Sequence, residues 1–315
     1  MVIVVKKVKN HNKILVISHI ADVDGMGSVI LGKKFYGDID YILCETRDLV
    51  EIFKDDFSSY DVIYVCDLPI CKDAINVIEE NQYLIERIKH FDHHESMVGS
   101  DNPEYINEVI TLNGKGTSGT HLFYNYLNSI GNRLDKKFYH TFVEAVRSYD
   151  IWDFNGDFEF GKQITTLFGI LGSDYFINAI CLLDDSGDFV LPDVYKELIK
   201  NDEVLMMEYI DKLSQNICIC DYNGKNMAVV ICEKYRSILG NYICQKYPNV
   251  DFVLIVNFER KSCSLRAAKD DTPLGEVARY FHHNGGGHIR SAGFVIDKES
   301  MPKIKKYINS YLDNI

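Results

Sequence analysis

The segment 87–94, Arg-Ile-Lys-His-Phe-Asp-His-His, is the strongest indication of the fold, because a strand-like apolar run ends there in one acidic and two imidazole side chains. Three other apolar runs end in polar groups of the same kind, namely His19-Ile20-Ala21-Asp22-Val23-Asp24-Gly25, Asp67 and Asp150. The carboxyl ends of parallel strands meet at one edge of an open sheet, where ligands bind. We therefore expect these side chains to gather into an oxygen-rich metal site. With two imidazoles it suits Mn²⁺ or Mg²⁺ better than a structural zinc site, which would favour thiolates.

Apolar runs alternate with helical patterns through the first half of the chain. The predicted strands are 13–18, 39–44, 61–66 and 87–91, and the predicted helices are 25–36, 72–80, 117–130 and 136–146. Such alternation predicts an α/β fold with a doubly wound parallel sheet. Residues 1–12 carry lysines without a long apolar core, which favours a first strand over a signal peptide.

The pattern changes after a polar loop at 184–193 and a long predicted helix at 194–215. Asn223-Gly224 lies between two apolar runs, 217–221 and 227–232, and predicts a hairpin. Runs at 252–258 and 262–267, a helix at 274–281, a strand at 292–296 and a helix near 299–312 follow. We predict a first domain over 1–190, a helical linker over 191–215 and a smaller α+β domain over 216–315.

The composition limits the kinds of partner. With 46% hydrophobic and 25% charged residues, the 315-residue chain is an ordinary globular protein. A net charge of −12 argues against a broad basic surface that coats long nucleic acid, although bound cations and local Arg or Lys would still allow a phosphate substrate. No window approaches ~18 apolar residues, so we expect no membrane span. Nine cysteines without a CxxC pair favour a reduced, cytoplasmic setting.

Each acidic motif also has a simpler interpretation. Asp22 or Asp24 could cap the helix that follows, and Asp67 could be an ordinary turn residue. One of the two histidines after Asp92 could be structural, and Asp153 could be a surface or capping residue. Thr117-Ser118 resembles a helix N-cap with secondary contact to an anion. The metal interpretation gains weight only when the motifs are counted together.

A second kind of motif lies near the C-terminus, at Gly285-Gly286-Gly287-His288. Backbone without Cβ atoms can approach an anion closely, so a phosphate site is one interpretation and a flexible turn is the other. Arg266 and Arg290 favour the phosphate, because a guanidinium matches phosphate oxygens in a bidentate contact. We interpret His282 and His283 as a helix terminus rather than as metal ligands.

Taken in order, these motifs resemble the DHH phosphoesterase superfamily with its DHH-associated C-terminal domain. RecJ-type exonucleases, nanoRNases and cyclic dinucleotide phosphodiesterases belong to it. The resemblance runs from about His19 to Phe294 and includes Ser264-Leu265-Arg266, the three glycines with His288, and Ala292-Gly293. Length and the compact second domain look most like the nanoRNase branch. Arg290-Ser291 is a departure, because small or apolar residues are common there in the family.

The resemblance implies a role for each matching residue. It implies that one Mn²⁺ is held by His19, Asp22 and Asp67. The second would be held by Asp24, Asp67, His93 and Asp150, with Asp67 shared. His94 would stand beside the reacting phosphate, so that His94 and Asp67 are the catalytic residues. A substrate phosphate or nucleotide would be held across an interdomain cleft by His288 and Arg266, with Gly285, Gly286 and Gly287.

The expected activity is Mn²⁺-dependent hydrolysis of short oligonucleotides to mononucleotides by a water that two cations activate, with Mg²⁺ as an alternative ion. A cyclic nucleotide or cyclic dinucleotide phosphodiesterase and a phosphoanhydride hydrolase are alternative enzymes. A nucleotide-binding regulator without turnover is the alternative outside enzymes, and the full His and Asp set argues against it. The expected partners exclude long duplex nucleic acid and membranes. The sequence leaves open whether the protein forms a homodimer, whether its substrate is linear or cyclic, and whether it prefers RNA or DNA.

Overall fold

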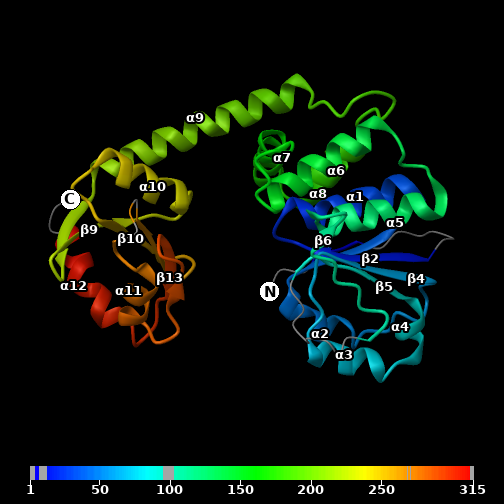
Figure 1. Ribbon diagram of the computed structural model, residues 1–315, viewed down its shortest axis with the longest axis horizontal. Helices are drawn as coiled ribbons and strands as arrows, with labels where there is room; N and C mark the ends of the chain where they lie inside the picture. The colour runs from blue at the N-terminus through cyan, green and yellow to red at the C-terminus, as the bar shows by residue number, and fades with distance from the viewer. Residues whose placement is uncertain (1–3, 7–12, 95–102, 268, 270, 313–315) are drawn as a thin grey trace. The chain divides into compact units, whose positions relative to one another are not determined.

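The computed structural model describes residues 4–6, 13–94, 103–267, 269 and 271–312. The chain divides into two compact units, residues 1–199 and 200–315, and each is described by itself (Figure 1). The division falls within the long helix α9 (Asp193–Gln215), which lies inside the predicted linker. Among the described residues, no helix has the length and apolar character that a membrane crossing needs.

A five-stranded sheet forms the centre of the first unit. Its strands are β1 (Val4–Lys6), β2 (Ile14–His19), β3 (Asp40–Cys44), β4 (Val62–Cys66) and β5 (Ile88–Phe91), in the order β1-β3-β2-β4-β5. The four strands β2 to β5 are parallel, as the sequence predicts. The edge strand β1 pairs antiparallel with β3, and the rest of the predicted strand over 1–12 lies outside the described residues.

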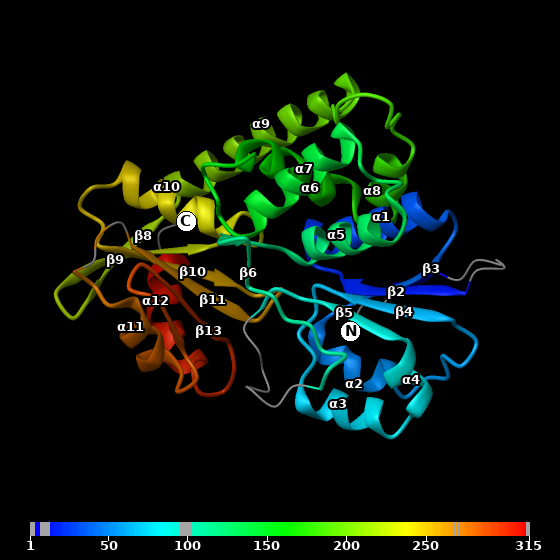
Figure 2. The same cartoon turned by 45° about the vertical axis from the view of Figure 1, so that its right-hand side comes forward.

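Helices cover both faces of this sheet, which confirms the doubly wound α/β class (Figures 1 and 2). One face packs against α1 (Val23–Tyr36), α5 (Gly119–Gly131), α6 (Lys137–Asp150), α7 (Phe158–Leu171) and α8 (Ser173–Cys181). The other packs against the short helices α2 (Leu49–Ile52), α3 (Lys72–Glu79) and α4 (Gln82–Arg87), and the single turn η1 (Thr46–Asp48) directly precedes α2. Neighbours in one strand point to opposite cores, as Leu15 and Val16 do, so both are fully buried. Burial on two faces explains why the strands read as continuous apolar runs.

Asp150 does not follow a strand, and the expectation that it ends a strand-like run is wrong. It is the last residue of α6, a helix predicted to end at residue 146. The helix continues because Arg147 is buried and bonded, at 2.6 Å to Glu144 Oε1 and at 2.9 Å to the Gly116 carbonyl. Asp150 therefore reaches the sheet edge from a helix that packs above it.

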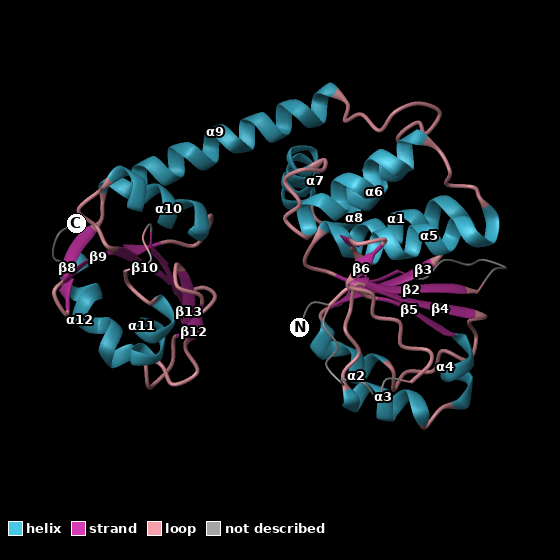
Figure 3. Ribbon diagram, in the orientation of Figure 1, coloured by secondary structure: helices cyan, strands magenta, loops and turns pink. Residues whose placement is uncertain are grey.

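The second unit is a mixed α+β domain built on a six-stranded sheet (Figure 3). The sheet order is β12-β13-β11-β10-β9-β8, where the strands are β8 (Cys218–Tyr222), β9 (Lys225–Ile231), β10 (Phe252–Asn257), β11 (Ser262–Ala267), β12 (Gly286–Gly287) and β13 (Ser291–Val295). One face packs against α11 (Leu274–Phe281) and α12 (Met301–Leu312), and the other against α10 (Arg236–Lys246). Asn223 and Gly224 have φ values of 52° and 79°, as the predicted hairpin turn requires.

Candidate metal centre

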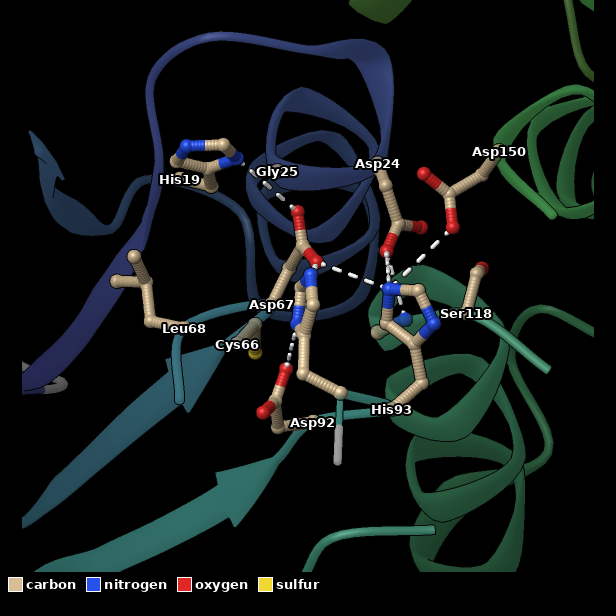
Figure 4. Close-up of polar contacts among 12 residues, drawn as sticks. His19, Asp24, Gly25, Cys66, Asp67, Leu68, Asp92, His93, Ser118 and Asp150 are labelled. Atoms are coloured by element: carbon tan, nitrogen blue, oxygen red, sulfur yellow. Dashed lines mark hydrogen bonds and ion pairs between the residues drawn. The ribbon is translucent and has the colours of Figure 1, made fainter. Parts of the chain in front are cut away.

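Six side chains that the sequence predicts as ligands come together at the carboxyl edge of the first unit's sheet. Figure 4 labels five of them, His19, Asp24, Asp67, His93 and Asp150. Their positions differ in kind, because strands, loops and a helix each contribute. His19 ends β2, Asp22 and Asp24 open α1, Asp67 follows β4, His93 follows β5 and Asp150 ends α6. They form groups in which the ligand atoms lie within 4.8 Å of one another, and two of these groups are His19-Asp22-Asp67 and Asp24-His93-Asp150.

The first group is held by the loop between β2 and α1. His19 Nδ1 lies 2.6 Å from Asp22 Oδ2 and 3.6 Å from Asp67 Oδ2. The other oxygen of Asp22 accepts the Gly25 N–H at 3.0 Å and caps α1. The capping and ligand interpretations of Asp22 are therefore compatible, because each uses a different oxygen.

The second group surrounds His93. Its Nε2 lies 3.3 Å from Asp150 Oδ2 and 3.8 Å from Asp24 Oδ2. Both oxygens of Asp24 accept backbone N–H groups at the start of α5, from Gly119 at 2.6 Å and Thr120 at 3.0 Å. The predicted anion contact at this helix N-terminus is thus made by a side chain of the protein itself. Ser118 caps the same helix by accepting the His121 N–H.

Asp67 lies between the two groups. Its Oδ2 faces His19, and its Oδ1 lies 3.3 Å from His93 Nε2 (Figure 4). The side chain is 2% exposed, and the backbone has a φ of 55°, in a left-handed region that is rare for a non-glycine residue. An unfavourable backbone conformation at a functional site is maintained by the surrounding structure. The geometry allows one carboxylate to reach a ligand at either side.

The carboxylates of the cluster lie close together and are buried or partly buried, so bound positive charge would stabilise their ionised forms. Burial and the charges of neighbouring carboxylates raise the pKa of Asp67 well above its usual range and that of Asp150 to about 7. Burial acts to lower the pKa of His19, but its contacts with Asp22 and Asp67 raise it to about 10. Crowded carboxylates oppose one another's ionisation unless a cation compensates them.

Three buried atoms at the centre have no hydrogen-bond partner in the described part of the chain: Asp67 Oδ2, His93 Nε2 and Asp150 Oδ2. Buried polar atoms without partners are costly, and a divalent cation would pair with all three kinds. The residues present therefore fit divalent cations.

The third residue of the acidic motif, His94, is held differently from His93. Its Nδ1 donates to Asp92 Oδ1 at 2.8 Å, and Asp92 is completely buried. Burial acts to raise the pKa of Asp92, but this hydrogen bond and the nearby charges of His90, His94 and His93 together outweigh it, so the pKa is lowered. One oxygen of the buried Asp92 carboxylate thus has an imidazole partner. The His94 side chain is 47% exposed, which leaves it accessible to a substrate.

Two residues of the site were not predicted. Glu45, directly after β3, has an oxygen 3.6 Å from His19 Nε2. Like Asp67, Glu45 directly follows a parallel strand, so it could have been predicted to lie at the carboxyl edge of the sheet. His90 is buried within β5 and bonds through Nε2 to the Leu68 carbonyl at 2.9 Å, while its Nδ1 accepts the Asn107 N–H. No sequence signal separates such a structural histidine from a ligand.

The predicted substrate residues lie in the second unit. Arg266 lines a pocket of about 390 Å³ together with Arg290 and Ser291. Gly285 is buried, and its N–H donates to the His282 carbonyl at 2.7 Å. Gly286 and Gly287 form β12, which pairs with β13. His288 is exposed at the end of this strand.

The remaining two motif histidines differ in exposure, because His282 is buried and His283 is exposed, and each contacts a carboxylate. His282 Nε2 lies 3.0 Å from Asp297 Oδ2, and the His283 side chain contacts Glu299. His282 follows α11 directly, in agreement with its interpretation as a helix terminus.

Known proteins share parts of this sequence and fold. No family model matches the chain. The oligoribonuclease NrnB of Bacillus subtilis (strain 168) is 25% identical over 88% of this chain and 72% of its own length. Among solved structures, manganese-bound RecJ of Thermus thermophilus matches 96% of this chain and 52% of its own, with a TM-score of 0.59 and 14% identity. A DHH domain from a member of a ribosomal protein family matches 96% of this chain and 86% of its own, with a TM-score of 0.57 and 12% identity.

The resemblance to the DHH phosphoesterase superfamily is confirmed as a likeness. The chain is similar in sequence to the oligoribonuclease NrnB and in fold to the RecJ and DHH-domain structures.

Proposed function

We propose that the protein is a metal-dependent phosphodiesterase that hydrolyses short oligonucleotides to mononucleotides. The carrying observation is the pair of ligand groups at the carboxyl edge of the sheet, His19-Asp22-Asp67 and Asp24-His93-Asp150, with Asp67 Oδ1 only 3.3 Å from His93 Nε2 of the second group. Similarity to the oligoribonuclease NrnB over 88% of the chain supports the substrate class. The net charge of −12 supports a short substrate over a long strand.

The ligands proposed for two divalent cations follow the two groups. His19, Asp22 and Asp67 would hold one ion, and Asp24, Asp67, His93 and Asp150 the other. Carboxylates and imidazoles suit Mn²⁺, and Mg²⁺ is an alternative because oxygen atoms dominate. Bound there, such ions supply Lewis-acid stabilisation of a phosphoryl group and lower the pKa of water.

The protein's own contribution is to fix these groups and to add a donor. Asp24 is held by two N–H groups of α5, so it cannot rotate away from His93 without losing both bonds. Asp92 holds His94 through Nδ1 and would leave its Nε2 to meet a phosphoryl oxygen. Such a fixed donor stabilises charge that develops in the transition state.

The second unit would select the substrate. Arg266 and Arg290 offer two guanidinium groups in one pocket, and guanidinium groups suit phosphate oxygens. We include Gly285, Gly286, Gly287 and His288 in this proposal as the adjoining segment.

The test is a panel of substrates incubated with pure protein and Mn²⁺. It contains 5′-phosphorylated dinucleotides, cyclic dinucleotides and pyrophosphate, each followed by chromatography of the products. We expect mononucleotides from the linear dinucleotides at the highest kcat/KM. Faster turnover of a cyclic dinucleotide or of pyrophosphate would reassign the substrate, and no turnover of any would overturn the proposal.

A further inference from the structure

Four aromatic rings cluster where α6 ends and α7 begins, directly after the candidate ligand Asp150: Tyr149 in α6, Trp152 and Phe154 in the turn, and Phe158 in α7. Trp152 and Phe154 are 66% and 68% exposed, although both are large apolar side chains. Trp152 lies 6.3 Å from Tyr149 with the planes 24° apart, and 5.7 Å from Phe158, measured between ring centroids. Phe154 and Phe158 are 4.4 Å apart. Trp152 and Phe154 are open to solvent and pack against the partly buried Tyr149 and the buried Phe158, and we call this set of rings the aromatic platform.

The backbone beneath the platform is fixed. Trp152 has a φ of 57°, which is unfavourable for a bulky side chain. The turn is held on both sides of it, because Trp152 N–H donates to the Tyr149 carbonyl and Asp153 N–H to the Ser148 carbonyl at 2.8 Å. The Asp153 carboxylate also pairs with the buried Arg147 guanidinium at 2.7 Å. An exposed indole in a strained but anchored turn indicates a binding role rather than a packing role.

The place of the aromatic platform next to Asp150 in the chain indicates which part of a substrate it would contact. Asp150, a candidate ligand, lies two residues before Trp152 and belongs to the same helix end. A phosphodiester that reached the cations would therefore bring its adjoining nucleoside to this turn. The polar groups of the turn are acidic or already paired, as with Asp153 and Arg147, so they do not offer a second phosphate site. Aromatic rings instead suit the flat face that every nucleobase presents.

We propose that the aromatic platform stacks a nucleobase next to the phosphate that is cleaved, an inference that rests on the proposed function. Trp152 supplies the main surface and Phe154 extends it. Stacking does not read the hydrogen-bonding edge of a base, so the platform gives affinity with little preference among the four bases.

The chain itself provides a direct probe, because Trp152 is its single tryptophan. A non-hydrolysable phosphorothioate dinucleotide is titrated into the full-length protein with Mg²⁺, while tryptophan emission and calorimetric heat are recorded in parallel. We expect saturable quenching with the same Kd as the calorimetry. An abasic dinucleotide should bind without quenching. Calorimetric binding with unchanged emission would overturn the stacking alone. Absence of binding by every dinucleotide would instead count against the proposed function and remove the basis of the stacking.

Kinetics separates stacking from an effect on Asp150. We measure kcat/KM of Trp152→Ala for a 5′-phosphorylated dinucleotide and for its abasic analogue, and we expect the ratio of the two values to fall at least about fivefold. Trp152→Phe should retain most of the ratio, and Trp152→Leu should lose it. Tyr175→Ala, at an equally exposed aromatic residue of α8, is the matched control and should leave the ratio unchanged. An equal loss on both substrates would overturn the proposal, because it would mean that Trp152 acts by positioning Asp150.

Discussion

At the scale of single residues, Asp67 is the side chain on which both ligand groups depend. Its two oxygens face His93 and His19 respectively, and its backbone occupies a left-handed conformation. Substitution of Asp22 or Asp150 would remove a ligand from one group only. The loss of Asp67 would disturb both groups together.

Asp67→Ala should therefore abolish turnover and lower the metal content of both groups. The loss in kcat should exceed the roughly 10–100-fold that changes around a metal ligand cause. Asp153→Ala is the comparison and should lose less turnover and no metal, because the Asp153 carboxylate pairs with the Arg147 guanidinium and belongs to neither ligand group. Metal analysis and kcat on a dinucleotide are measured for folded protein. Wild-type rates with unchanged metal content in Asp67→Ala would refute its assignment.

We expect Asp92 to support turnover by orienting the His94 imidazole and not by binding metal. Asp92→Asn keeps the size of the side chain but weakens the hydrogen bond that orients the imidazole at 2.8 Å. We expect kcat to fall about 10–100-fold, the range seen when an orienting partner of a histidine is removed, while metal content stays at the wild-type value. Steady-state kinetics with metal analysis tests this. A variant that loses its metals while folded would show that Asp92 acts on His93 as well.

At the scale of elements, the start of α5 holds the site together. A Cβ atom at Gly119 would lie 2.7 Å from Asp67 Cβ and 2.8 Å from its backbone nitrogen, so only glycine allows this approach. The same residue donates its N–H to Asp24. One helix end therefore positions a carboxylate from each of two other elements.

Gly119→Ala should lower the free energy of unfolding by about 1–3 kcal/mol, because the added methyl must displace Asp67 backbone. Gly169→Ala, at an exposed position of α7 with no atom within 4 Å of the added Cβ, is the control. It should be neutral or stabilising by up to about 1 kcal/mol through helix propensity. Urea denaturation compares the two. Equal stability of both variants would contradict the tight contact.

The strands and their ligands could be predicted from the sequence better than the helix ends and the side-chain pairings. The strands β2 to β5 could be predicted within about a residue, because burial on both faces produces apolar runs that end in polar groups. The ligands after these strands follow from the same rule. Asp150 could not be placed correctly, since its helix is prolonged by tertiary contacts of Arg147. Pairings such as Asp92 with His94 and Asp24 with α5 depend on the fold and leave no local signal.

At the scale of the whole molecule, the motifs divide between two units. The ligands proposed for the two cations belong to residues 1–199, while Arg266 and the glycine motif belong to residues 200–315. Such a division allows chemistry and substrate choice to be changed separately, which single substitutions can test.

Arg266→Ala should weaken turnover of a 5′-phosphorylated dinucleotide without changing metal content. The loss of a charge-assisted hydrogen bond should lower kcat/KM by the equivalent of about 1.5–3 kcal/mol. Arg236→Ala is the control, because its guanidinium bonds Ser262 and Ser264 on the same sheet. Unchanged kcat/KM in Arg266→Ala would remove this residue from the substrate site.

The central claim is that paired ligand groups sharing Asp67 bind the divalent cations on which hydrolysis depends. The most direct measurement follows dinucleotide turnover after prolonged dialysis against a chelator and then during stepwise return of Mn²⁺, with the bound metal counted at each step. The account predicts that turnover is lost with the metal and returns as both groups fill, approaching two ions per chain. Full turnover in excess EDTA, with no metal bound, would contradict it.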